Sequence, residues 1–188
     1  MAPFFIKLAA GIWLVWLVSW QVAAFWRAKP SVSMPRKEYR VHFMVIIVGL
    51  LLVFGIWPRR GPYLWQVSPV LGWSMIAVTA AGFVFAWWAR IHLGNLWSGG
   101  IERMAHHRVV DTGPYALARH PIYTGMIAAA AAMAALRATP WAFLGLAGFA
   151  VGFVLKAKAE ERFLEQELGG YEEYRRRVSM IVPLPRRA

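Results

Sequence analysis

Long apolar stretches alternate with short polar ones along the chain, and this pattern predicts about five membrane helices. A helix needs about 20 mostly apolar residues to cross roughly 30 Å of hydrocarbon. The apolar stretches cover about residues 4–26, 41–57, 67–92 and 122–155. The last stretch is interrupted near Thr139 and Pro140, which suit an N-cap and the first position of a helix. It is therefore predicted to form two antiparallel helices joined by a tight turn.

The final helix has two features that extend this picture. Gly145, Gly148 and Gly152 form a face of small residues, and such faces let helices approach closely in lipid. We therefore expect the final helix to pack tightly against the helix before it. Residues 156–168 are strong helix formers, so the helix is predicted to continue into the cytoplasm as far as Gly169-Gly170, before a short basic helix over 171–177. The expected fold class is an all-α integral membrane protein with a cytoplasmic helical segment.

The composition agrees with a membrane protein. Of 188 residues, 59% are hydrophobic and 11 are Trp, and the mean hydropathy is +0.46, which is too apolar for a soluble domain of this length. The formal net charge of +12 falls in short runs between apolar segments, which indicates anionic lipid head groups as partners and not nucleic acid. The chain has no Cys, so disulfides, thiolate metal sites and a cysteine nucleophile are excluded.

Charge also predicts the orientation in the membrane. The loop after the first predicted helix carries one acid, Glu38, among the basic residues Arg27, Lys29, Arg36, Lys37 and Arg40. By the positive-inside rule this loop is cytoplasmic, which puts the N-terminus outside. The first apolar run is too long for a signal-peptide core and no A-x-A site follows it, so we expect a retained membrane helix.

The polar stretch 107–125 lies between long apolar segments and is dense in groups that bind ligands. Gly113-Pro114 is a turn signal, and Pro121 is predicted to occupy the first turn of the next helix. Arg119 and His120 would then lie at a helix N-terminus, where an anion binds readily. A basic loop that touches lipid phosphates is an equally good interpretation of these residues alone.

Ionisable groups from several segments meet on the predicted cytoplasmic side, which makes a functional site the default hypothesis. They are His107, Tyr115, Arg119, His120, Tyr123, Glu160 and Glu161. The spacing of His and acidic residues does not suit a metal, and the chain lacks a nucleophile elbow, a Walker loop and a dinucleotide-binding glycine motif. The alternative for Glu160 and Glu161 is a solvated helix face paired with Lys156 and Arg162.

Two motifs together carry a family resemblance. GPYALARHPIYTG, followed after an apolar hairpin by EERFLEQELGGYEEYRRRVSMIVP, resembles the isoprenylcysteine carboxyl methyltransferase family and is similar to its small prokaryotic members. Phospholipid N-methyltransferases share a similar RHPxY and paired-acid pattern, and membrane sterol reductases are more distantly similar. The resemblance implies one domain over 1–188, with a catalytic core in 67–188 and two additional membrane helices in 1–66. It also implies the inner membrane of a prokaryote, with the active site facing the cytoplasm.

The resemblance implies a site for S-adenosylmethionine at the ends of the last two membrane helices. The implied cofactor-binding residues are His107, Val109, Val110, Gly113, Tyr115, Arg119, His120, Pro121, Tyr123, Glu160 and Glu161. Arg119 or His120 would hold the carboxylate of the cofactor. Glu160 or Tyr123 would face its amine and sulfonium. The implied catalytic residues are Lys156, Glu160 and Arg119, and no metal is expected.

The methyl acceptor implied by the resemblance is a carboxylate on an isoprenylcysteine-like molecule that arrives sideways from the bilayer. The family uses an Arg about one turn before its paired acids, where this chain has Lys156, and Lys cannot clamp a carboxylate with a planar fork. The alternatives are N-methylation of an amino-phospholipid, with Glu161 or His120 as base, and a non-catalytic membrane scaffold. Membrane lipids and a lipophilic or lipidated acceptor are the expected partners. The loop 93–106 is a candidate lid.

Overall fold

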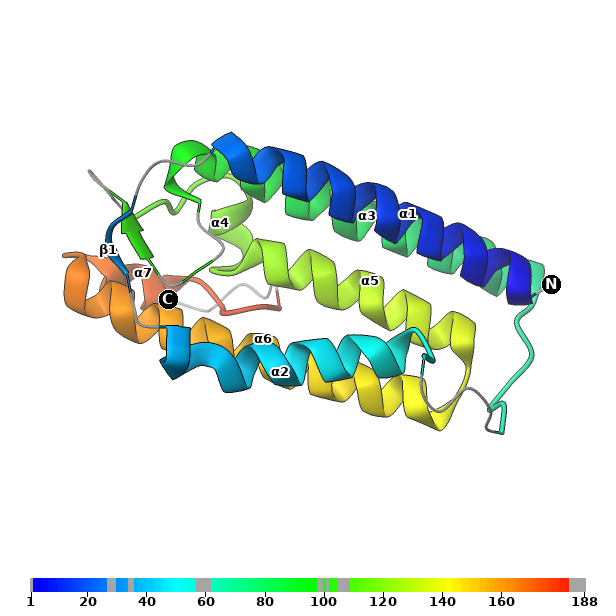
Figure 1. Cartoon of the computed structure of the whole chain (residues 1–188). Helices are drawn as coiled ribbons and strands as arrows, with labels where there is room; N and C mark the ends of the chain where they lie inside the picture. Colours follow the sequence, from blue (N-terminus) through cyan, green and yellow to red (C-terminus); the bar gives the residue numbers. More distant parts are fainter. Residues whose placement is uncertain are drawn as a thin grey trace.

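Five long helices run side by side and alternate in direction along the molecule (Figure 1). They are α1 (Ala2–Ala23), α2 (Arg36–Val53), α3 (Pro69–Leu93), α5 (Pro121–Arg137) and α6 (Pro140–Glu167). Helix α3 packs along α5 and α2 along α6, while α1 lies against α3 and α5 also touches α6. The computed structural model describes residues 2–26, 30–33, 36–56, 62–97, 100, 102–104 and 109–182.

The short elements gather at one end of this bundle, beyond the C-terminal ends of α1, α3 and α6 (Figure 1). They are the 3-10 helices η1 (Ala24–Trp26) and η2 (Gly94–Leu96), the helices α4 (Pro114–Leu117) and α7 (Tyr171–Arg177), and the strands β1 (Pro30–Ser33) and β2 (Glu102–Met104). The two strands pair in an antiparallel ladder. The helical fold class is therefore as predicted, and the two short strands add one small ladder in the connecting segments.

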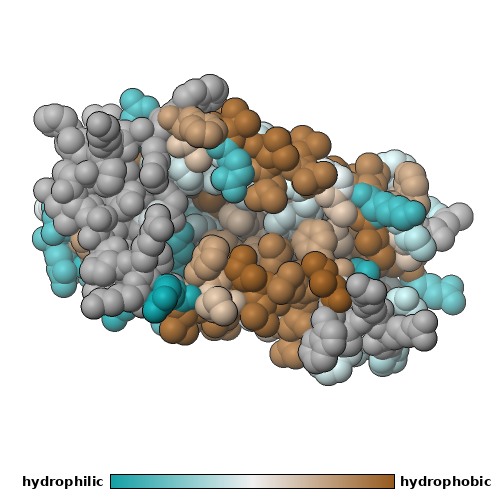
Figure 2. All heavy atoms as spheres, viewed as in Figure 1, coloured by the Kyte–Doolittle hydropathy of each residue, from teal (hydrophilic) through white to brown (hydrophobic). Residues whose placement is uncertain are grey.

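Three helices of the described chain are long and apolar enough to cross a membrane: Ala2–Ala23, Pro69–Leu96 and Pro140–Glu167. The apolar segments Arg40–Val53 and Pro121–Arg137 are shorter. Large apolar side chains such as Val15, Val70 and Val84 are more than two-thirds exposed, and brown patches of such residues cover the sides of the bundle (Figure 2). Lipid contact explains such exposure. The chain is therefore an integral membrane protein, while the count of five spans and their orientation stay predictions.

Local signals set most of the helix boundaries. The Thr139 side chain accepts a hydrogen bond from the Ala142 N–H and Pro140 begins α6, as the sequence predicted. Pro121 likewise begins α5, and α6 continues to Glu167 before Gly170 turns the chain into α7. Helix α2 ends at Val53, four residues earlier than expected, because Gly55 adopts a left-handed conformation with a φ of 66°.

Glycines hold the helix pairs in close contact. A Cβ on Gly82 of α3 would lie 2.6 Å from the carbonyl oxygen of Gly125 in α5. A Cβ on Gly145 of α6 would lie 2.6 Å from the carbonyl oxygen of Gly49 in α2, and one on Gly152 would meet Ile46 of α2. The small-residue face of α6 therefore packs against α2. The expectation that it packs against α5 was wrong, because α5 turns its own glycine toward α3.

The first prediction concerns these close contacts. Gly82→Ala should destabilise the protein by about 1–3 kcal/mol, because the added methyl group forces the α3 and α5 backbones apart. Gly11→Ala is the matched control, since no described heavy atom lies within 4 Å of a Cβ there and Ala favours a helix. Equilibrium unfolding in detergent, followed by Trp fluorescence, measures both. Equal stability of the two variants would contradict the close packing.

Candidate active site

One cavity of about 580 Å³ joins the polar end of the bundle to its apolar middle. Its apolar arm lies between α1 and α2 and is lined by Trp16, Leu17, Phe43, Ile46, Ile47 and Leu50, with Phe149 and Phe153 of α6. Its polar end is lined by Tyr115, His120, Tyr123, Lys156 and Glu160. In Figure 2 the surface is hollowed between the brown patch over α1 and α3 and that over α2. The cavity thus offers charged and apolar walls to one ligand or to two adjoining ones.

Glu160 is the centre of the polar end. The Tyr123 hydroxyl donates to its carboxylate, 2.7 Å from Oε1 and 2.8 Å from Oε2. Lys156, one helical turn earlier, places Nζ 3.6 Å from Oε1, and His120 places Nδ1 3.5 Å from Oε2. The His120 and Tyr123 rings stack at 5.2 Å, so their contacts hold each other in place. The carboxylate is therefore fixed in orientation by three side chains from two helices.

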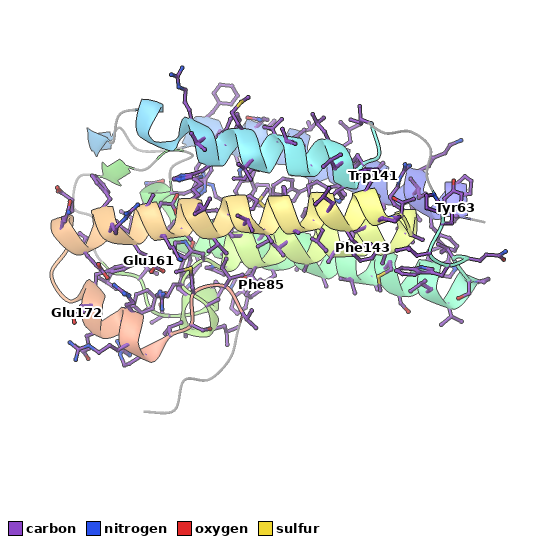
Figure 3. The ribbon with its side chains drawn as sticks, turned by 90° about the horizontal axis from the view of Figure 1, so that it is seen from below. Tyr63, Phe85, Trp141, Phe143, Glu161 and Glu172 are labelled. Carbon is purple, nitrogen blue, oxygen red and sulfur yellow. The ribbon has the colours of Figure 1, made fainter. Side chains whose placement is uncertain are left out.

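Glu161 faces the other way and forms a buried ion pair with Arg119. Arg119 Nε donates to Glu161 Oε1 at 2.7 Å and Nη2 donates to Oε2 at 3.0 Å, a two-pronged geometry in which both side chains are at most 5% exposed. His120 Nε2 lies 3.1 Å from the same Oε1. Figure 3 shows Glu161 on the side of α6 that faces α7. The two neighbouring acids therefore have different surroundings, and His120 touches both.

Arg119 also holds the chain that follows α7. Its Nη1 donates to the carbonyl of Arg175 at 2.9 Å and to that of Val178. The backbone N–H groups of Arg119 and His120 donate to the carbonyls of Ser179 and Met180 at 2.9 and 3.0 Å. These bonds fix the segment after α7 against the start of α5.

Three buried tyrosines form the aromatic wall of the polar end. Tyr115 of α4 and Tyr171 and Tyr174 of α7 line the cavity, and the Tyr174 hydroxyl donates to the Tyr115 carbonyl at 2.7 Å. Burial raises the pKa of each of these phenols above its usual value, so all three stay neutral at physiological pH. The wall is therefore uncharged and offers ring faces to a ligand.

The structure brings together most of the residues expected from the sequence. Eight of them line the cavity: Val109, Val110, Tyr115, Arg119, His120, Pro121, Tyr123 and Glu160, and Lys156 joins them. Gly113 and Glu161 do not line it. Gly113 has a φ of 59° at the start of α4, where a Cβ would lie 2.8 Å from the His92 ring, so it shapes the turn. His107 and residues 98, 99, 101, 105 and 106 of the candidate lid at 93–106 lie outside the described residues.

Sequence reasoning missed two groups of lining residues. Tyr171 and Tyr174 are three apart on α7 and so share a face, a spacing that could have marked them. Trp20 and Trp97 meet edge to face at 5.5 Å, and the Arg90 guanidinium lies 4.2 Å above the Trp97 ring. Arg90 also donates to the Ala23 carbonyl at 3.0 Å, so it ties the end of α1 to the cavity wall. No sequence signal shows that these residues meet.

The fold and the site define a helical integral membrane protein with a polar cavity at one end of its bundle. Residues 75–166, from α3 to α6, match the model of the isoprenylcysteine carboxyl methyltransferase (ICMT) family, which confirms over this segment the family suspected from the sequence. The matched segment contains the Arg119-His120-Pro121 sequence and both glutamates.

Curated proteins are similar over a longer stretch. The chain is 27% identical over 156 residues to Methanethiol S-methyltransferase 1 of Bradyrhizobium diazoefficiens, covering 78% of this chain and 54% of that protein. It is 32% identical over 145 residues to Methanethiol S-methyltransferase 2 of the same organism, covering 71% and 55%. It is 33% identical over 150 residues to the cobalt-zinc-cadmium resistance protein CzcN of Cupriavidus metallidurans, covering 77% and 62%. The chain thus spans little more than half the length of the first two.

The second prediction concerns the buried ion pair. Glu161→Gln should destabilise the protein by about 3–5 kcal/mol, because it leaves the Arg119 charge buried without its partner. The amide N–H groups of Arg119 and His120 should also exchange faster with solvent, since the segment after α7 is then held less firmly. Glu172→Gln is the control: its pair with Arg176 is exposed and should contribute at most about 1 kcal/mol. A cost for Glu161→Gln as small as that of the control would show that the pair does not organise the site.

Proposed function

We propose that this protein transfers a methyl group from S-adenosylmethionine to an anionic atom of an apolar acceptor. The observation that carries the proposal is one continuous cavity, whose charged end adjoins an apolar arm between α1 and α2. Membership of residues 75–166 in a methyltransferase family and the two similar proteins named as methyltransferases support it. Binding lipid head groups alone, as in a scaffold, does not require a cavity that combines aromatic, charged and apolar walls.

The chemistry of the lining fits the cofactor. S-adenosylmethionine carries an ammonium and a sulfonium, which suit the fixed Glu160 carboxylate, and an adenine, which suits the wall of Tyr115, Tyr171 and Tyr174 with Val109 and Val110 beside it. The cavity volume of about 580 Å³ lies within the roughly 300–1,000 Å³ of pockets for ligands of this size. The cofactor would supply an electrophilic methyl group.

Arg119 has a different role in this proposal from the one that the family resemblance implied. Four hydrogen bonds to Glu161, Arg175 and Val178 use four of its five N–H groups, so one N–H is left for the carboxylate of a cofactor. We assign Arg119 and Glu161 to positioning. They hold His120 and the segment after α7, while Glu160 faces the cavity and contacts the cofactor.

The residues that line the first cavity would act by aligning the acceptor with the methyl donor and by excluding water. Methyl transfer needs the acceptor atom, the methyl carbon and the sulfur in line, and a rigid pocket supplies that order in advance. Tyr123, His120 and Lys156 hold Glu160 in one orientation. The apolar arm keeps water away from the acceptor, which strengthens every charge interaction in the cavity.

Lys156 is the residue that selects the acceptor atom. Its Nζ lies 5.3 Å above the Tyr123 ring centroid and lines the cavity where the polar end meets the apolar arm. A single ammonium stabilises a thiolate as well as it does a carboxylate, but it lacks the planar fork that orients a carboxylate. We therefore favour an apolar thiol as acceptor, consistent with the names of the two methanethiol S-methyltransferases.

The apolar arm favours an acceptor larger than methanethiol. Lys156 and Phe149 both line the cavity and are seven residues apart on α6, which corresponds to about 10 Å at 1.5 Å per residue. An acceptor whose anionic atom lies near Lys156 can therefore bury a long apolar group beneath it. The same arm keeps an isoprenylcysteine-like carboxylate as the second candidate, because a prenyl group would fill it.

The third prediction tests the cofactor site. Calorimetric titration of the detergent-solubilised protein with S-adenosylhomocysteine should show one saturable site. Glu160→Gln should weaken binding about tenfold or more, because a hydrogen bond from the cofactor ammonium to a charged acceptor is lost. Glu172→Gln removes one exposed acid from α7 and should leave the affinity unchanged. A folded wild-type protein without saturable binding would overturn the methyltransferase proposal.

The fourth prediction separates the two acceptors. With membranes and a radiolabelled methyl donor, a thiol acceptor gives a thioether whose label survives alkali, whereas a carboxylate gives an ester that releases labelled methanol. Lys156→Met should also move the rising limb of the pH–rate profile to higher pH if the acceptor is a thiol, because the cation that favours the thiolate is gone. A carboxylate is already ionised near neutral pH, so its profile should keep its position while the rate falls. Lys156→Arg restores the charge and should restore the wild-type profile.

A further inference from the structure

A second cavity, of about 470 Å³, lies on the other side of the Arg119–Glu161 pair. It is lined by residues of α2, α6 and α7 and by Met180, which follows α7. Helix α6 contributes Leu155, Lys158, Arg162 and Glu165, while His42 of α2 and Arg175 of α7 complete the rim. Arg119 lines both cavities, so the buried ion pair is the wall between them.

The charges of this second cavity do not balance. Four cations and two carboxylates line it. Glu161 pairs with Arg119 and Glu165 pairs with Arg175, which accounts for both acids. Lys158 and Arg162 are exposed, lie one helical turn apart, and have no ion-pair partner among the described residues. The cavity therefore presents two uncompensated positive charges on one helix face.

A stripe of exposed apolar side chains on α6 lies next to Lys158 and Arg162, on the same face of the helix. Leu144, Val151 and Leu155 are 56%, 52% and 36% exposed, and they share the helix face of Lys158 and Arg162. Exposed apolar side chains on a membrane helix face acyl chains. Leu155 is the last apolar residue before the charged segment that begins at Lys156, so this cavity lies where acyl chains give way to head groups.

His42 adds a polar atom that lacks a partner. Its ring lines the cavity from α2, and its Nδ1 is buried with no hydrogen-bond partner among the described residues. A phosphate oxygen in the cavity would give this nitrogen an acceptor. Buried polar atoms without partners are few in folded proteins and call for an explanation of this kind.

We propose that this second cavity binds the phosphate head group of an anionic phospholipid, with its acyl chains along the apolar stripe of α6. Lys158 and Arg162 neutralise the phosphate, His42 Nδ1 donates to it, and Leu155 contacts the glycerol end of the chains. The apolar stripe selects a lipid over a free phosphate ion, because an ion gains nothing from exposed Val151 and Leu155. A zwitterionic lipid binds less well, since its own cation competes with the two basic side chains.

The test is lipid binding to the delipidated, full-length protein, measured by native mass spectrometry with added phosphatidylglycerol or phosphatidylcholine. We expect one tightly retained phosphatidylglycerol and no retained phosphatidylcholine. Replacing Lys158 and Arg162 together by Gln should weaken retention about thirtyfold, since each cation near an anionic head group contributes about a factor of five. The charge-conserving double variant Lys158→Arg, Arg162→Lys should retain the lipid as the wild type does.

The matched control removes two cations elsewhere. Lys7→Gln with Arg176→Gln lowers the net charge equally, at exposed positions outside this cavity, and should leave retention unchanged. Inorganic phosphate is added in a separate arm. Displacement of the lipid by phosphate at equal concentration would make the free ion the ligand and overturn the lipid proposal. Equal retention of both lipids, or retention that ignores Lys158 and Arg162, would overturn it as well.

Discussion

The buried pair between Arg119 and Glu161 is the interaction on which the organisation of this end of the bundle depends. Burying two charges costs several kcal/mol each, and only good geometry with further hydrogen bonds offsets that cost. Here the guanidinium meets the carboxylate in a two-pronged contact, and Nη1 donates to two backbone carbonyls. The pair therefore ties together the start of α5, the middle of α6 and the chain after α7.

This pair also determines how the neighbouring acid is presented. Successive residues on an α-helix point about 100° apart, so fixing Glu161 toward Arg119 turns Glu160 into the large cavity. His120 contacts both acids and transmits the position of one to the other. A loosened Arg119 would disturb Glu160 without touching it, which is why two adjacent glutamates of the same chemistry have separate roles.

The shape of the cavity follows from a different constraint, the glycine contacts of the helix pairs. Gly82 and Gly125 bring α3 and α5 together, and Gly49 and Gly145 do so for α2 and α6. Helix α1 lies against α3 and α5 while α2 packs along α6, and the apolar arm lies between α1 and α2. Bulky side chains such as Trp16 and Phe43 line the arm and do not close it. The close glycine contacts within the two helix pairs thus leave the apolar arm open toward lipid between α1 and α2.

Signals carried by a few neighbouring residues were enough to predict much of this fold. Pro121 predicted the start of α5 and Thr139-Pro140 that of α6, because a proline or a capping side chain acts within one turn. Local signals do not predict which helix packs against a given helix face. The glycines of α6 predicted close contact, but the choice of α2 over α5 depends on a second glycine, Gly49, far away in the chain. The meeting of α7 with Tyr115 could not be predicted for the same reason, since no local pattern relates the two.

Arg119 lines both cavities, so its guanidinium could pair either with Glu161 or with an anion bound in the second cavity. The large cavity needs Arg119 bound to Glu161 so that His120 and Glu160 keep their positions. The second cavity also has the buried Arg119 guanidinium in its wall, close to any anion that binds beside Lys158 and Arg162. The two-pronged contact decides the competition, because a bound phosphate would have to displace both oxygens of a carboxylate that is already desolvated. A lipid phosphate is therefore held by the two unpaired cations on the rim of its cavity, and the ion pair stays intact behind it.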